Sequence, residues 1–128
     1  MLRILVVDDE PALRDTLSRA LRRAGHDAMA VGNGRSGLEA LQQDSFDAVI
    51  TDIFMPECDG IELIREMRAG QHREPVLAIS GGGTYGNDFL LPMARMLGAQ
   101  ATLRKPFAPS EVVAAVEAIA GAEAARRT

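Results

Sequence analysis

The sequence predicts an α/β fold in which a parallel β-sheet is covered by helices on both faces. Short apolar runs alternate five times with longer stretches whose apolar residues recur at helical spacing. Chains that alternate strands and helices form parallel sheets, and their crossover helices lie on both faces. Several of the apolar runs end in a polar or charged residue, which predicts a cluster of polar groups at one edge of the sheet.

The first unit consists of a strand and an amphipathic helix. Residues 2–7 (LRILVV) are β-rich and end abruptly at the acidic residues Asp8, Asp9 and Glu10. Pro11 stands where the first turn of a helix tolerates proline. The apolar residues that follow at helical spacing are Leu13, Leu17, Leu21 and Ala24. The helix is expected to end at a glycine, Gly25.

The second and third units repeat this pattern. Residues 27–31 are a short second strand, and residues 34–43 are a helix with its leucines on one face. Residues 46–50 (FDAVI) are a third strand that runs into Thr51 and Asp52. Breaking residues follow, and a third helix begins at Ile61 and ends near Gly70.

The fourth and fifth units complete the chain. Residues 75–79 (PVLAI) are a fourth strand that Ser80 closes, and a helix is predicted over residues 88–97. Residues 101–104 are a short fifth strand, and Pro109 starts the last helix. The crossovers between the parallel strands are expected to be right-handed. We predict one domain over residues 1–121 and a C-terminal tail over residues 122–128 that frays.

Composition restricts the class of protein. The chain has 128 residues, 47% hydrophobic, which suits one globular domain with a proper core. Its net charge of −4 argues against nucleic acid as the direct ligand. A single cysteine, Cys58, excludes an intramolecular disulfide, and no apolar run approaches the ~20 residues that span a bilayer. We expect a cytoplasmic protein with no membrane partner, and we expect His26 and His72 at its surface.

Five polar residues follow the ends of predicted strands: Asp8, Asp9, Asp52, Ser80 and Lys105. The carboxyl ends of parallel strands meet at one edge of a sheet, where ligands bind in this class of fold. Either of the first two acids alone would be read as a cap of the following helix. The third acid favours a metal site instead.

This set of side chains suits phosphoryl transfer. Two carboxylates ~4 Å apart repel each other by roughly 4 kcal/mol at an effective dielectric of 20, so three in one cleft need a cation. Mg²⁺ accepts carboxylate oxygens, keeps waters and bridges to phosphate oxygens. The lysine adds a fixed positive charge, the serine a hydroxyl donor, and one aspartate a nucleophile.

Four short motifs carry a family resemblance. They are VVDDEP at 6–11, DIFMPECDG at 52–60, AIS at 78–80 and KPF at 105–107. Each is weak alone, but together, in this order and spacing, they resemble the receiver domain of two-component response regulators. The resemblance covers nearly the whole chain. It implies a flavodoxin-like doubly wound sheet with strand order 2-1-3-4-5.

The resemblance also implies a role for each matching residue. Asp52 matches the phosphoacceptor. The remaining matches are Asp9 as a direct Mg²⁺ ligand, Asp8 as an acid that binds the metal largely through water, Phe54 as the donor of a backbone carbonyl to Mg²⁺, Ser80 as the switch hydroxyl and Lys105 as the lysine that pairs with the phosphoryl group. The Lys105–Pro106 bond is expected to be cis. The implied partners are a histidine kinase or histidine phosphotransfer protein and an unknown downstream protein.

The chain departs from the family pattern at three places. Thr102 occupies the position that is usually Tyr or Phe, so the usual aromatic switch is missing. Phe54 places a large ring over the site, whereas Gly81 and Gly82 leave its approach open. The loop after Ser80 is longer than in common receivers and resembles that of stand-alone receivers, which have no output domain.

Other functions compete with this interpretation. The leading expectation is a signalling module that is no enzyme beyond catalysing its own phosphorylation and dephosphorylation. A receiver cut from a longer DNA-binding regulator is an alternative. A Mg²⁺-dependent aspartyl-phosphate phosphatase is disfavoured because no acid stands two residues after Asp52. A flavin or nucleotide binder would need its phosphate loop after the first strand, where the acids would repel phosphate.

Overall fold

The structure is a computed structural model that describes residues 1–53, 60–80 and 90–127. Strands and helices alternate along the chain, as the hydrophobic pattern predicts. The elements are β1 (Arg3–Val7), α1 (Pro11–Arg23), β2 (Asp27–Val31), α2 (Gly34–Gln43), β3 (Ala48–Asp52), α3 (Gly60–Ala69), β4 (Val76–Ser80), α4 (Leu90–Leu97), β5 (Ala101–Arg104) and α5 (Pro109–Arg127).

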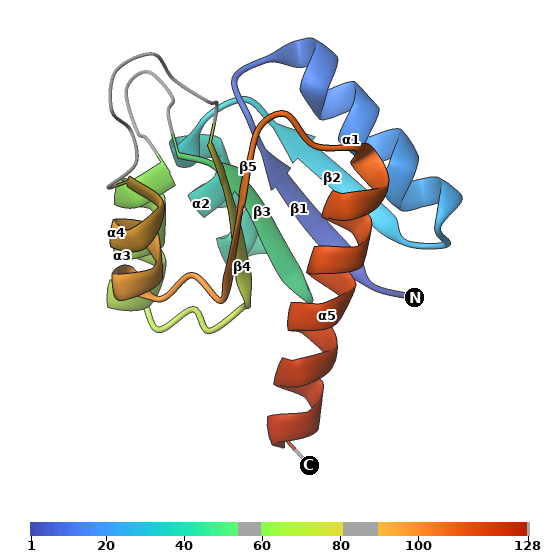
Figure 1. Cartoon of the computed structure of the whole chain (residues 1–128). Helices are drawn as coiled ribbons and strands as arrows, with labels where there is room; N and C mark the ends of the chain where they lie inside the picture. Colours follow the sequence, from blue (N-terminus) through green and yellow to red (C-terminus); the bar gives the residue numbers. More distant parts are fainter. Residues whose placement is uncertain (54–59, 81–89, 128) are drawn as a thin grey trace.

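The strands form one parallel sheet in the order β2-β1-β3-β4-β5, which confirms the predicted flavodoxin-like topology. Helices α1 and α5 cover one face of the sheet, and α2, α3 and α4 cover the other (Figure 1). Because helices cover both faces, the central strands β1, β3 and β4 are buried almost throughout. This double burial explains why their sequences read as continuous apolar runs.

Two hydrophobic cores lie on opposite sides of the sheet, and the central strands β1, β3 and β4 contribute to both. Along β1, Ile4 and Val6 point to the core under α1 and α5, whereas Leu5 and Val7 point to the core under α2 and α3. This alternation follows from the two-residue period of a strand. All four side chains are fully buried. Helices therefore pack against both faces of the sheet, and this packing fixes the positions of the strand ends.

The C-terminal helix is longer than the sequence interpretation suggested. The sequence predicts that residues 122–128 fray, but α5 continues to Arg127. Residues 122–127 are alanine, glutamate and arginine only, and these residue types have high helix propensity. The chain therefore has a physical reason to continue the helix past Gly121.

Among the helices of the described residues, none is long and apolar enough to cross a membrane.

The expectation that His26 lies at the surface is wrong. Its side chain is only 9% exposed, and its Nε2 lies 2.7 Å from Glu117 Oε2 on α5. Its Nδ1 accepts a hydrogen bond of 3.0 Å from the Leu2 backbone N–H. His26 therefore joins the start of the sheet to α5. Gly25 before it has φ of 92°, which agrees with the predicted glycine at the end of α1.

The two ends of the described chain lie away from the carboxyl edge of the sheet. Figure 1 shows β1 rising from the N-terminus and α5 descending to the C-terminus, beyond the edge at which the strands begin. The carboxyl ends of the strands point the opposite way. The polar residues predicted at those strand ends are therefore separated from both termini by the length of the sheet.

Candidate metal centre

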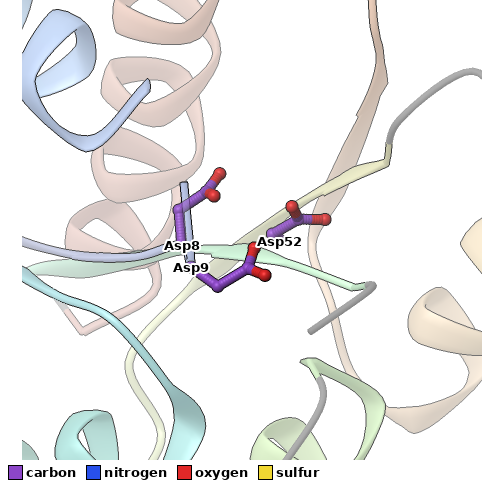
Figure 2. Close-up of side chains that lie close together, drawn as sticks. All are labelled: Asp8, Asp9 and Asp52. Carbon is purple, nitrogen blue, oxygen red and sulfur yellow. The ribbon is translucent and has the colours of Figure 1, made fainter. Parts of the chain in front are cut away.

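Three aspartates meet at the carboxyl edge of the sheet. Asp8 and Asp9 follow β1, and Asp52 is the last residue of β3. The two strands are neighbours, with Val7 opposite Thr51, so their ends meet. One carboxylate oxygen from each aspartate lies within 4.8 Å of those of the other two (Figure 2). The structure thus brings together the three acids that the strand ends predict.

Asp8 is the most constrained of the three. Its side chain is 0% exposed, and its Oδ1 accepts a hydrogen bond of 2.9 Å from the Glu10 backbone N–H. Within the described residues, the buried Oδ2 of Asp8 has no hydrogen-bond partner. Burial raises the pKa of Asp8 to about 6, and the charges of Asp52 and Asp9 act in the same direction. The Glu10 N–H and Lys105 oppose this rise of the pKa.

The alternative role of the first two acids, as caps of α1, receives no support. The residue at the cap position is Glu10, which makes no side-chain cap hydrogen bond. Asp8 accepts a hydrogen bond from the N–H of Glu10 through its Oδ1, and one of its carboxylate oxygens lies within 4.8 Å of those of Asp9 and Asp52. Asp9 is exposed, so the cluster remains open to solvent on its side. The acids therefore lie close together, and neither Asp8 nor Asp9 occupies the cap position of α1.

Lys105 brings a positive charge to the cluster. Its Nζ lies 3.5 Å from Asp52 Oδ2, with the lysine side chain 25% exposed and the aspartate side chain 7% exposed. The peptide bond between Lys105 and Pro106 is cis, as expected. The backbone N–H of Lys105 donates to the carbonyl of Ser80, 2.8 Å away. Ser80 ends β4 and is 2% exposed, so the predicted serine and lysine sit side by side at the ends of neighbouring strands.

Gly60 is part of the site, and the sequence interpretation missed this. Helix α3 begins at this glycine. A Cβ at this position would press against the carbonyl oxygen of Asp52 and lie 2.7 Å from the Ile53 Cα. The N–H of Gly60 also donates to the Ile53 carbonyl, 3.0 Å away. The absence of a side chain therefore lets α3 begin directly against the backbone of the central acid.

Some predicted features fall outside the described residues. These are the backbone carbonyl of Phe54 and the glycines Gly81 and Gly82. Thr102 lies on β5 opposite Ala78 of β4 and is partly buried. The position that usually holds an aromatic ring is thus filled by a short side chain within the sheet.

The donor set fits a hard divalent cation. Three carboxylates and one ammonium group leave an excess of negative charge, and one buried carboxylate oxygen has no donor among the described residues. A buried carboxylate without compensation is costly. Mg²⁺ takes one or two carboxylates and keeps several waters, and the exposed side of Asp9 leaves room for them. Asp8, Asp9 and Asp52 are therefore the residues that would hold the ion.

A family match and the similar proteins agree on one family for this chain. Residues 4–117 match the family described as response regulator receiver domain. The chain is 38% identical over 126 residues to the transcriptional regulatory protein FixJ of Bradyrhizobium diazoefficiens, covering 98% of this chain and 60% of that protein. It is 32% identical over 117 residues to the alkaline phosphatase synthesis transcriptional regulatory protein PhoP of Bacillus subtilis, covering 91% of this chain and 48% of that protein.

Solved structures with the same fold include one chain that this chain covers almost completely and one that it covers in part. The chemotaxis response regulator CheY4 of Vibrio cholerae superposes with a TM-score of 0.82 at 27% identity, covering 93% of this chain and 98% of that chain. Full-length FixJ superposes with a TM-score of 0.83 at 36% identity, covering 92% of this chain and 57% of that chain. The chain thus spans about half to three fifths of the curated relatives named above and nearly all of the solved CheY4 chain.

Proposed function

The chain belongs to the response regulator receiver domain family, and from that premise we propose that Asp52 accepts a phosphoryl group from a histidine kinase or a histidine phosphotransfer protein. The single observation that supports this role best is the position of Asp52. Its carboxylate lies within 4.8 Å of oxygens of two further acids, and its Oδ2 is 3.5 Å from the ammonium nitrogen of Lys105. A nucleophile that must take a dianionic group needs such positive charge close to it.

Each residue of the site has its own role in the phosphoryl transfer. An oxygen of Asp52 forms the new bond to phosphorus while the bond from phosphorus to the donor imidazole nitrogen breaks, and that nitrogen keeps the electron pair. Bound Mg²⁺, held by Asp8, Asp9 and Asp52, would supply positive charge for the oxygens of the phosphoryl group. Lys105 adds a second positive charge beside Asp52 Oδ2. The Ser80 hydroxyl then donates to the acyl phosphate.

The signal follows from the change in charge. A phosphoryl group adds about −1.5 to −2 charge at neutral pH. Ser80 and Lys105 both respond to it, and they are joined by a backbone hydrogen bond of 2.8 Å between β4 and β5. Their movement would shift the edge of the sheet at β4 and β5 and so present a changed surface to a partner protein. In this proposal the domain catalyses only its own phosphorylation and hydrolysis.

A second output is favoured by the longer relatives. FixJ and PhoP are named as transcriptional regulatory proteins, and the chain covers 60% and 48% of their lengths. The domain would then control a DNA-binding segment of the same polypeptide. Reading the gene beyond the codon for Thr128 distinguishes the two outputs. A stop codon there supports a separate partner protein, and a continuing reading frame supports the longer regulator.

The phosphoacceptor role is tested with a small phosphodonor. The chain is incubated with acetyl phosphate and Mg²⁺, and intact-mass spectrometry measures the added phosphoryl group. Wild type is expected to gain one group, and chelation by EDTA is expected to abolish the gain. Asp52→Asn removes the nucleophile, whereas Asp15→Asn changes an exposed acid on α1 as a matched control. Labelling that persists in Asp52→Asn, or that survives EDTA, would contradict the proposal.

A further inference from the structure

We propose that Arg14 is a positioning residue that sets the affinity of the site for Mg²⁺ by holding the backbone of Asp8. The inference rests on the function proposed above. Arg14 lies in the second turn of α1, outside the cluster of acids, and none of the roles assigned above involves it. Its influence on the metal would pass through Asp8.

Arg14 contacts the backbone at the end of β1. Its Nη1 donates to the carbonyl oxygen of Asp8, 2.8 Å away. On its other side, the Asp8 N–H donates to the Val31 carbonyl of β2, 3.1 Å away. Both backbone polar groups of Asp8 are therefore fixed, one by the neighbouring strand and one by the side chain of Arg14.

A glycine makes this contact possible. Gly32 directly follows β2, and a Cβ at this position would lie 2.9 Å from Arg14 Nη1. The guanidinium group thus passes over the backbone at Gly32 on its way to Asp8. Because the conflicting atom is the end of a flexible side chain, a Cβ at Gly32 would displace the guanidinium group and spare the backbone.

Precise placement of Asp8 matters because its carboxylate is wholly buried. It cannot compensate for a backbone shift by turning toward solvent, and its buried Oδ2 has no hydrogen-bond donor among the described residues. Mg²⁺ demands near-ideal octahedral geometry with oxygen distances of about 2.0–2.1 Å. Loss of residues that orient metal ligands typically costs about 10–100-fold in metal affinity.

The same helix offers a matched control. Arg22 lies two turns further along α1, and its Nη2 donates to the Ala28 carbonyl of β2, 3.2 Å away. The bond is of the same kind, from a guanidinium group to a strand carbonyl, but it lies near the beginning of β2, far from the acids. Replacing Arg22 therefore reports what such a bond contributes to stability alone.

The first experiment measures Mg²⁺ affinity by isothermal titration calorimetry and unfolding by urea in EDTA. Arg14→Ala is expected to raise the Mg²⁺ dissociation constant by about 10-fold. Arg14→Lys keeps a cationic donor and is expected to recover part of that loss. Arg22→Ala is expected to leave the dissociation constant within about twofold of wild type. If Arg14→Ala and Arg22→Ala both leave Mg²⁺ affinity unchanged, the proposal is overturned and Arg14 serves stability alone.

A second experiment tests the route through Gly32. Gly32→Ala is expected to weaken Mg²⁺ binding in the presence of Arg14 and to add nothing in the Arg14→Ala background, since the same hydrogen bond is already lost. Additive effects of the two substitutions would contradict the proposal.

The phosphorylation assay distinguishes the role proposed for Arg14 from the role proposed for Asp52. Raising Mg²⁺ to saturation is expected to restore the initial rate of labelling of Arg14→Ala by acetyl phosphate. A rate that stays low at saturating Mg²⁺ would show that Arg14 acts elsewhere. Wild type that neither binds Mg²⁺ nor becomes labelled would instead overturn the function proposed for Asp52.

Discussion

At the scale of single residues, the buried carboxyl group of Asp8 links the site to pH. Its pKa is raised from 3.8 to about 6 in the folded protein, chiefly by burial. Between these two values the unfolded chain releases this proton while the folded chain retains it, so the contribution of Asp8 to stability falls as pH rises. Below about pH 4 the group is protonated in both states and carries no penalty.

We therefore expect Asp8→Asn to stabilise the metal-free protein at pH 7.5. The shift of the Asp8 pKa corresponds to at most about 3 kcal/mol, because one pKa unit is about 1.36 kcal/mol. The difference in unfolding free energy between variant and wild type should shrink as pH falls from 7 to 4. Urea denaturation in EDTA across this range measures it, with Asp15→Asn as the control. A difference that is constant with pH would contradict the expectation.

Residue types and strand ends were enough to predict the acidic cluster and its lysine. Asp8, Asp52 and Lys105 each stand at or directly after the end of a strand, and the parallel sheet brings such positions together. The hydrogen bonds around the cluster were missed, because they depend on side-chain reach. Arg14 reads as an ordinary polar residue of a helix, and nothing in its spacing shows that it returns to Asp8.

At the scale of elements, the contact between α3 and β3 supports the central acid. Gly60 begins α3 directly against the carbonyl of Asp52 and the Cα of Ile53. Both neighbours are backbone, so they cannot move aside as a side chain would. A larger residue would have to push the helix or the end of the strand away.

Gly60→Ala is therefore expected to lower the unfolding free energy by about 2–3 kcal/mol, in the upper range for overpacking. The matched control is Gly121→Ala in α5, where a Cβ would meet nothing within 4 Å. That substitution is expected to stabilise by about 0.5–1 kcal/mol, since alanine is the better helix former. Urea denaturation measures both. Equal changes in the unfolding free energy for the two substitutions would show that α3 does not need the close contact between Gly60 and the backbone of Asp52 and Ile53.

The sequence predicts an element clearly when the element buries one face, which gives periodic apolar residues, or buries both faces, which gives a continuous apolar run. The helical spacing of α1 and the apolar runs of β1 and β4 identify them clearly. The boundary of α5 was missed because its last turns lack an apolar stripe, and there helix propensity decides instead. The contact of His26 with Glu117 joins residues far apart in sequence, so local patterns give no sign of it.

At the scale of the whole molecule, metal binding should couple to folding stability. The acids converge only when β1 and β3 are paired, so the unfolded chain has no comparable site. A ligand that binds only the folded state stabilises it by about 2.7 kcal/mol at 100 times its dissociation constant.

The strand order itself was predicted from family resemblance, since hydrophobic periodicity does not determine which strands are neighbours.

Saturating Mg²⁺ is thus expected to raise the unfolding free energy of wild type by about 2–3 kcal/mol. Asp8→Ala and Asp52→Ala should lose most of this gain. Lys105→Ala should retain it, because the lysine pairs with Asp52 but cannot bind a cation. Thermal or urea unfolding with and without Mg²⁺ measures the gain. Equal stabilisation of all four proteins would mean that the ion binds elsewhere.

The placement of the chain ends has a practical consequence for measurement. Both ends of the described chain lie away from the edge of the sheet that carries the acids (Figure 1). A biotin attached beyond α5 would therefore tether the molecule to a sensor chip with the acidic edge of the sheet facing the flowing solution. Kinase domains passed over such a chip would meet the acidic edge unobstructed, so immobilisation through the C-terminus suits binding kinetics on this protein.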